Sequence, residues 1–126
     1  MNPADRYLSD RVMTATPAQL TGILFEALSA AVRGAARLQQ EGDFPSALPR
    51  SLKAQRILVE LRTTLDHDAG PEIAGNLEAL YSWCHGNLVR ANRDRDPSAT
   101  RSVLDVVEQL EEAWNVGCLG RVAQPA

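Results

Sequence analysis

Two histidines and two cysteines are the first candidates for metal or nucleophilic chemistry in this chain of 126 residues. Cys84 and His85 are neighbours, but adjacent residues of a helix point about 100° apart. No second pair at metal-ligand spacing accompanies them, so a tetrahedral site is not completed. His67 stands between two aspartates ahead of a glycine, where a solvated or capping role in a turn is the simplest interpretation. We therefore predict no metal site and no cofactor.

The sequence also lacks the common motifs of catalysis. It has no G-x-x-x-x-G-K-[ST] phosphate loop, no G-x-G-x-x-G and no G-x-S-x-G. Neighbouring carboxylates such as Glu111 and Glu112 are typical of a solvated helix face. One alternative suits a small helical protein, a histidine phosphotransfer domain with His85 as the phosphate carrier. Gly86 follows His85, but the next turn lacks the lysine that would hold a phosphoryl group. We predict that the protein is not an enzyme.

The distribution of charge excludes further classes of partner. The formal net charge is −3, and acidic and basic residues are interspersed along the chain, so that no basic stripe is formed. Binding to nucleic acid or to an anionic membrane is therefore not expected. The apolar runs are far shorter than the roughly 20 residues that span a bilayer, and no apolar signal-peptide core follows the first residues. The two isolated cysteines fit a reducing compartment, so we expect a cytoplasmic protein.

Glycine and proline divide the chain into four segments of helical length. The first segment has the clearest start: Thr16 can cap a helix, and Gln19 stands at capping-box spacing from it. Apolar residues then recur every three or four positions to about residue 41, which indicates one helix face. The second segment extends to about Leu65. Within its first turns, Pro49 predicts either a bent start or a helix that begins at Pro49.

The third segment begins at Pro71 and the fourth at Pro97. No alternation with period two is long enough to indicate a strand, and short connections favour antiparallel neighbours. We therefore predict an all-α fold, an antiparallel up-down four-helix bundle over residues 16–116. Residues 1–15 would form an N-terminal arm, and residues 117–126 a flexible tail.

The apolar stripes predict which side of each helix faces the core. In chain order the stripes contain Leu20, Leu24, Ala27, Leu28, Ala31, Ala35 and Leu38; Ala47, Ser51, Ala54, Leu58, Leu61 and Leu65; Ile73, Leu77, Leu80, Tyr81, Cys84, Leu88 and Ala91; and Val103, Leu104, Val107, Leu110 and Trp114.

Several large apolar residues lie outside these stripes. They are Ile23 and Phe25 in the first segment, Leu52, Ile57 and Val59 in the second, and Trp83 in the third. One interpretation is that they seal the seams between neighbouring helices. Taken together, we interpret them as a groove for an amphipathic partner helix, because contiguous exposed apolar surface usually marks a binding site. The arm carries Tyr7, Leu8, Val12 and Met13 at helical spacing, which could fill the groove when no partner is present.

Four blocks of sequence carry a resemblance to a known family. They are Tyr7 ahead of V-M-T-A-T-P at residues 12–17, K-A-Q-R-I-L-V-E-L at residues 53–61 with Leu65-Asp66 after it, N-L-E-A-L-Y at residues 76–81 with L-V-R-A-N at residues 88–92, and a final helix that ends in Trp114. In this order the blocks resemble the flagellar secretion chaperone (FliS) family.

The resemblance implies a helical bundle that binds the C-terminal segment of flagellin and prevents its premature polymerisation. It also implies delivery of flagellin to the export gate of the flagellar type III secretion apparatus. Together with the surplus apolar positions, it predicts a set of partner-binding residues: Tyr7, Val12, Ile23, Phe25, Gln55, Ile57, Val59, Tyr81 and Asn92. A helical adaptor for another secretion component is the main alternative. Whether the free protein forms a homodimer stays open.

Overall fold

The computed structural model describes residues 2–124, and these residues form five α-helices and one short 3-10 helix. In chain order they are α1 (Pro3–Thr14), α2 (Pro17–Gln40), α3 (Phe44–Thr63), α4 (Pro71–Asp94), α5 (Pro97–Asn115) and η1 (Gly120–Ala123). No strand occurs between residues 2 and 124, so the prediction of an all-α fold is confirmed. None of these helices is both long enough and apolar enough to cross a membrane.

Local sequence signals set the starts of the helices. The predicted capping box is present, because Thr16 Oγ1 accepts a hydrogen bond from Gln19 N at 3.2 Å and Thr16 N donates to Gln19 Oε1 at 3.0 Å. Of the two alternatives predicted for the start of the second segment, a helix that begins at Pro49 is wrong, because α3 begins at Phe44. The carboxylate of Asp43 accepts from the backbone N–H of Ser46 at 3.1 Å, which caps α3 ahead of the proline. Pro49 therefore lies inside α3.

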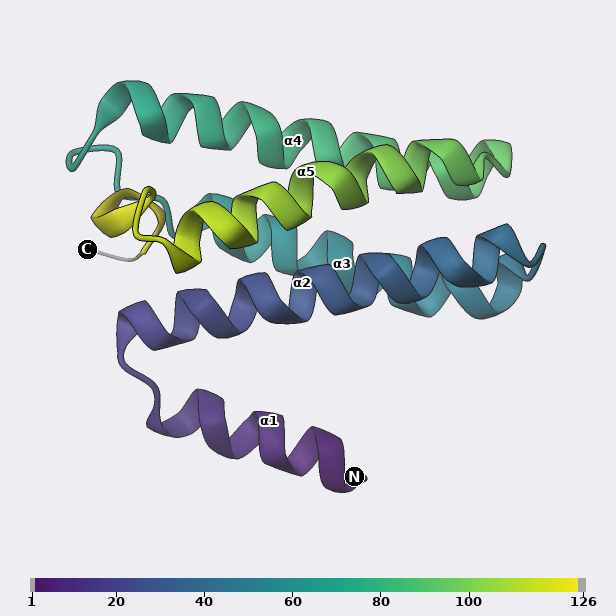
Figure 1. Cartoon of the computed structure of the whole chain (residues 1–126), viewed down its shortest axis with the longest axis horizontal. Helices are drawn as coiled ribbons and strands as arrows, with labels where there is room; N and C mark the ends of the chain where they lie inside the picture. Colours follow the sequence, from purple (N-terminus) through teal and green to yellow (C-terminus); the bar gives the residue numbers. More distant parts are fainter. Residues whose placement is uncertain (1, 125–126) are drawn as a thin grey trace.

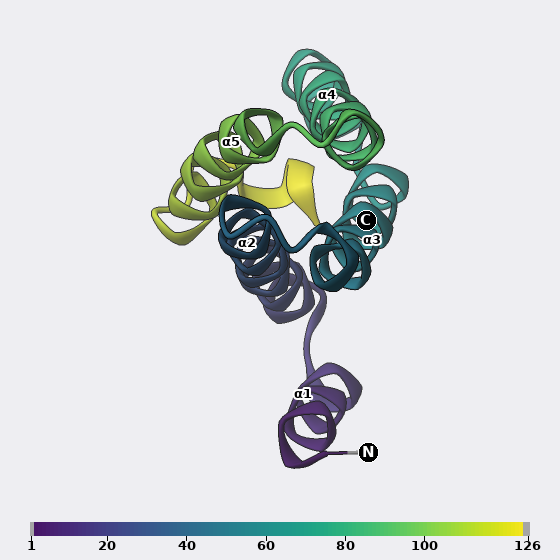
Figure 2. The same cartoon turned by 90° about the vertical axis from the view of Figure 1, so that its right-hand side faces the viewer.

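The four long helices α2–α5 form a ring, which we call the helical body. Helices α2 and α4 each pack against both α3 and α5 (Figure 2). Successive helices run in opposite directions, as Figure 1 shows. Helix α1 lies outside the ring and has no buried residue. Helix α1 therefore contributes no residue to the shared core.

The core of the helical body follows most of the predicted stripes, with two corrections on α4. Ile73 is 47 % exposed and Leu80 is 38 % exposed, although both were expected to face the core. The neighbouring residues Ala74 and Tyr81 are buried instead. One residue corresponds to about 100° of rotation, so the buried side of α4 is turned away from Leu80.

Helix α2 buries more than one narrow stripe, because it packs against α3 on one side and α5 on the other. Phe25 is 0 % exposed, and its ring lies against that of Trp114 of α5, with 6.0 Å between the centroids. Ile23 is also buried. Phe25 therefore faces a neighbouring helix, as the seam interpretation expects.

The C-terminal segment differs from the expected flexible tail. Val122 and Ala123 of η1 are buried and belong to the core cluster. The carbonyl of Val122 accepts a hydrogen bond from Asp66 N at 2.9 Å, which ties η1 to the α3–α4 connection. Small, non-periodic residues gave no signal of this long-range contact; the last two residues of the expected tail lie outside the described ones.

Candidate partner-binding site

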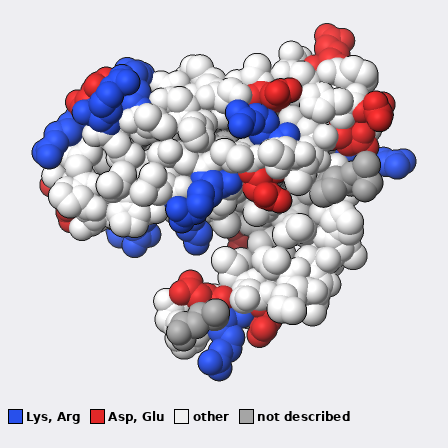
Figure 3. Space-filling model, turned by 180° about the vertical axis from the view of Figure 1, so that it is seen from behind, with Lys and Arg blue, Asp and Glu red and all other residues white. Residues whose placement is uncertain are grey.

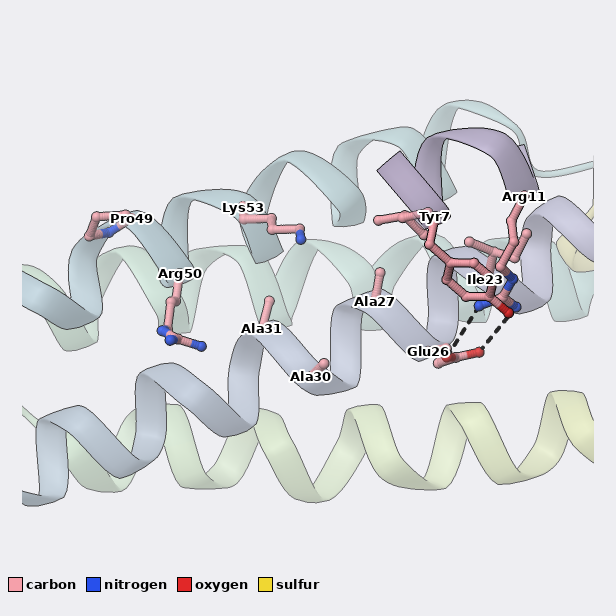
Figure 4. A pocket seen from close by; sticks show the side chains of 11 residues that line it. Tyr7, Arg11, Ile23, Glu26, Ala27, Ala30, Ala31, Pro49, Arg50 and Lys53 are labelled. Atoms are coloured by element: carbon pink, nitrogen blue, oxygen red, sulfur yellow. Dashed lines mark hydrogen bonds and ion pairs between the residues drawn. The ribbon is translucent and has the colours of Figure 1, made fainter. Parts of the chain in front are cut away.

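A groove of about 590 Å³ lies between α2 and α3, with α1 over one end (Figure 4). Helix α2 supplies a floor of mainly small apolar side chains, and α3 supplies a basic wall. The lining residues are Tyr7, Leu8 and Arg11 of α1, Ile23, Glu26, Ala27, Ala30 and Ala31 of α2, and Pro49, Arg50 and Lys53 of α3. The apolar floor and the open shape of the groove suit the binding of an amphipathic helix.

Helix α1 is held at this groove by few contacts. Arg11 pairs with Glu26 of α2 at 3.4 Å, and its guanidinium lies 5.7 Å from the centroid of the Tyr7 ring. Tyr7 itself is 66 % exposed. Solvent-exposed ion pairs of this kind contribute about 0–1 kcal/mol. Figure 3 shows an open hollow between α1 and the helical body, so α1 can leave the groove at low cost.

Two of the predicted partner-binding residues line the groove. Tyr7 lies over the end of the groove, and Ile23 forms part of the floor beneath it. Val12 is exposed on α1 but does not line the groove. Val59 is exposed on α3, at helical spacing from the exposed Leu52 and outside the groove.

Three of the predicted partner-binding residues are core residues in this structure. Phe25, Ile57 and Tyr81 are all buried and belong to one core cluster. The expectation that Phe25 and Ile57 lie on exposed flanks is therefore wrong, whereas Tyr81 faces the core as its place in the stripe of α4 predicts. The reason is the ring arrangement, in which each helix of the body has two neighbours and positions beside the stripe are covered.

Of the two polar residues of the predicted set, Asn92 joins helices inside the body, and Gln55 forms a hydrogen bond within α3. Asn92 of α4 donates from Nδ2 to Ser51 Oγ of α3 at 2.9 Å and accepts from Gln39 Nε2 of α2 at 3.3 Å. Gln55 Nε2 also donates to Ser51 Oγ, at 3.3 Å. Gln39 and Ser51 are buried. This polar network fixes the relative positions of α2, α3 and α4.

The titratable groups of the core are not poised for chemistry. Burial raises the pKa of the Cys84 thiol to about 12, and burial with the nearby Cys84 raises the pKa of Tyr81 far above its usual value. His67 lies outside the core, with Nε2 3.6 Å from the Glu78 carboxylate. Over the described residues, no group of three or more His, Cys, Asp or Glu side chains could hold a metal ion.

The basic wall of the groove was missed by the sequence reasoning. Helix α3 contains four basic residues and one acidic residue, whereas α5 contains four acidic residues and one basic residue. Basic side chains are prominent over the left and middle of the side shown in Figure 3. The available signal was the spacing of Arg50 and Lys53, which puts both on one side of a helix.

Comparison with known proteins identifies the family. Residues 1–118 match the family model of flagellar protein FliS. The chain belongs to the FliS family. It is 31% identical over 113 residues to the flagellar secretion chaperone FliS of Bacillus subtilis (strain 168), covering 90% of this chain and 84% of that protein. The corresponding protein of Salmonella typhimurium (strain LT2) is 34% identical over 104 residues, with 82% and 77% covered.

A third FliS chaperone, from Vibrio cholerae serotype O1, is 28% identical over 109 residues, covering 86% of this chain and 79% of that protein. The resemblance seen in the sequence blocks is thereby confirmed. FliS is a family of chaperones rather than enzymes. The region matched by the FliS model includes α1–α5, and therefore every residue of the groove.

Proposed function

We propose that the protein is a cytoplasmic export chaperone for flagellin. It binds the C-terminal segment of flagellin, prevents its polymerisation before export and delivers it to the export gate of the flagellar type III secretion apparatus. The observation that carries the proposal is the groove between α2 and α3, only part of which α1 covers, in a chain of the FliS family. In this proposal α2–α5 act as the antiparallel four-helix bundle, and α1 acts as its arm.

The low cost of moving α1 gives the groove a simple mode of action. An arriving amphipathic helix takes the place of α1 over Ile23, and Tyr7 moves aside or packs against the new helix. A client segment that folds on binding loses conformational entropy, which the burial of its apolar face against the floor must offset. The weak contacts of α1 favour binding of the client, because displacing α1 costs little of the affinity between client and chaperone.

The predicted contact residues divide into two roles under this proposal. Tyr7 and Ile23 contact the client directly, and the exposed Val12 and Val59 extend the contact where the client passes beyond the groove. Residues of the core and of the polar network set the groove walls by fixing how α2, α3 and α4 pack. Those residues are Phe25, Gln55, Ile57, Tyr81 and Asn92.

Co-purification with flagellin tests the proposal. The full chain is co-expressed with the C-terminal segment, about 40 residues, of the flagellin from the same organism, and the affinity is then measured by calorimetry. We expect a stable complex and a much slower polymerisation of full-length flagellin in its presence. The absence of a complex would contradict the proposal, and capture of an export-gate component without flagellin would support an adaptor instead.

Filling the groove provides a matched pair of variants. Ala30 is exposed on the floor of the groove, and Ala79 is exposed on α4 outside it. Because tryptophan at position 30 would occupy the space of the client helix, Ala30→Trp should weaken flagellin binding at least tenfold. Ala79→Trp adds the same side chain elsewhere and should leave the affinity unchanged.

A further inference from the structure

The groove has a covered half and an open half. Tyr7 and Arg11 lie over the end at Ile23 and Glu26, as Figure 4 shows. In Figure 4, Arg50 and Lys53 of α3 extend toward the α2 floor, and the labelled α1 residues Tyr7 and Arg11 lie toward the opposite end of the groove. The open half is therefore bounded by α2 and α3 alone.

The two basic residues of the open half lack an acidic partner. Among residues 2–124, neither Arg50 nor Lys53 forms an ion pair or a side-chain hydrogen bond with a carboxylate. Glu26 is the one carboxylate that lines the groove, and it pairs with Arg11 at the covered end. Two positive charges thus face an apolar floor without compensation.

Gly34 explains how Arg50 lies at the end of the groove. A Cβ atom at position 34 would lie 2.7 Å from Arg50 Nη1 and 2.9 Å from Arg50 Cδ. Glycine at position 34 leaves this space open on α2, so the arginine side chain lies there; with a larger residue the flexible arginine would shift. The guanidinium therefore lies beside the groove, where it can bind an anion.

The spacing of the basic residues sets the geometry of a complementary ligand. Arg50 and Lys53 are three residues apart, or about 4.5 Å along the axis of α3. A helix lying along the groove presents carboxylates at nearly the same interval if they are three or four residues apart. The alanine floor allows such a helix to approach closely, since interaxial distances shrink toward about 8 Å when the contact residues are small.

We propose that Arg50 and Lys53 select a client helix that carries two carboxylates, three or four residues apart, beside its apolar face. This inference rests on the proposed function, because it names the chemistry that the same groove recognises in its client. The ion pairs form at the edge of a contact from which water is partly excluded, so they discriminate more strongly than freely exposed pairs.

Charge reversal within one helix tests the inference. The double variant R50E/K53E is compared with R56E/R62E, which changes the net charge equally on exposed residues of α3 that do not line the groove. Binding of the flagellin C-terminal segment is measured by calorimetry at low and at high salt. We expect R50E/K53E to lose at least about tenfold in affinity at low salt, with a smaller loss at high salt. R56E/R62E should lose less than about threefold.

A second pair of ligands separates this inference from the proposed function. Two designed amphipathic helical peptides share one apolar face and carry either two glutamates or two lysines three residues apart beside it. The full-length protein should prefer the glutamate peptide at least about tenfold, and R50E/K53E should reverse the preference. If flagellin does not bind but this reversal is seen, the proposed function fails and the inference stands.

Three results would overturn the inference. The first is equal binding of both peptides, and the second is an equal loss of affinity in R50E/K53E and R56E/R62E. The third is a dimer, detected by sedimentation, that dissociates in R50E/K53E while flagellin binding is unchanged, because the groove would then belong to a second copy. R50Q/K53Q removes the charges without reversing them and replaces R50E/K53E if circular dichroism shows that the reversal disturbs folding.

Discussion

Replacing Tyr81 by phenylalanine should stabilise the protein, although Tyr81 is among the most deeply buried side chains. Tyr81 is 1 % exposed, and its hydroxyl has no hydrogen-bond partner in the structure. An unsatisfied buried hydroxyl costs about 1–3 kcal/mol, whereas the ring is retained in the variant. We expect Tyr81→Phe to raise the free energy of unfolding by about 1 kcal/mol, equivalent to a rise in Tm of about 3–5 °C.

The same substitution should change how the free energy of unfolding depends on pH above pH 10. Burial raises the pKa of Tyr81 above its ordinary value of 10.0, so the folded state holds the phenolic proton more tightly than the unfolded state. This contribution to stability is fully present below pH 10 and is lost as the pH rises above it. At pH 11 the loss is on the order of 1 kcal/mol for one proton. The advantage of Tyr81→Phe over the wild type should therefore grow from about 1 to about 2 kcal/mol.

Urea unfolding followed by far-ultraviolet circular dichroism measures both effects, at pH 8 and at pH 11. Burial also raises the pKa of Cys84, from 9.0 to about 12, so the contribution of Cys84 to the stability of the protein is likewise lost as the pH rises. This loss occurs in the wild type and in Tyr81→Phe alike. Tyr7→Phe is the matched control and should change nothing, because Tyr7 is exposed. If Tyr81→Phe were less stable than the wild type at pH 8, the hydroxyl of Tyr81 would have a hydrogen-bond partner after all. If the free energy of unfolding fell equally in both proteins between pH 8 and pH 11, the pKa of Tyr81 would not be raised.

Three further predictions concern the cap, the polar network and the thiols. Thr16→Ala removes the capping box of α2 and should lower the free energy of unfolding by about 1 kcal/mol in urea titrations. Asn92→Leu leaves the buried amide of Gln39 without its partner and should cost about 1–3 kcal/mol; a neutral result would mean that the amide reaches another partner. A thiol reagent should modify Cys118, which is exposed, in the native protein and Cys84 only after unfolding. Two fast-reacting thiols without denaturant would contradict the burial of Cys84.

Features governed by neighbouring residues could be predicted from the sequence. The capping box at Thr16 depends on residues three positions apart, and it is present in the structure. The predicted core face of α3 agrees with the buried residues there, because the helical spacing of apolar residues alone marks the side of a helix that faces the core. Neither feature depends on which helix lies opposite.

Features governed by distant contacts could not be predicted. Whether Leu80 or its neighbour Tyr81 faces the core depends on how α4 is rotated between α3 and α5. The burial of Val122 depends on a hydrogen bond with Asp66, more than fifty positions away in the sequence. The spacing of apolar residues along one sequence gives no information about either contact.

The search for surplus large apolar residues was a poor guide to the groove, for a physical reason. In a ring of helices, a large side chain beside the core stripe fills the seam with the next helix, as Phe25 does against Trp114. A groove persists where side chains are too small to fill that seam, and here the floor is formed largely by alanines, with Gly34 beneath Arg50 at its end. The signal of a binding groove on such a helix is therefore a run of small residues at the seam with the next helix, beside charges that lack partners. Helix α2 shows the first of these and α3 the second.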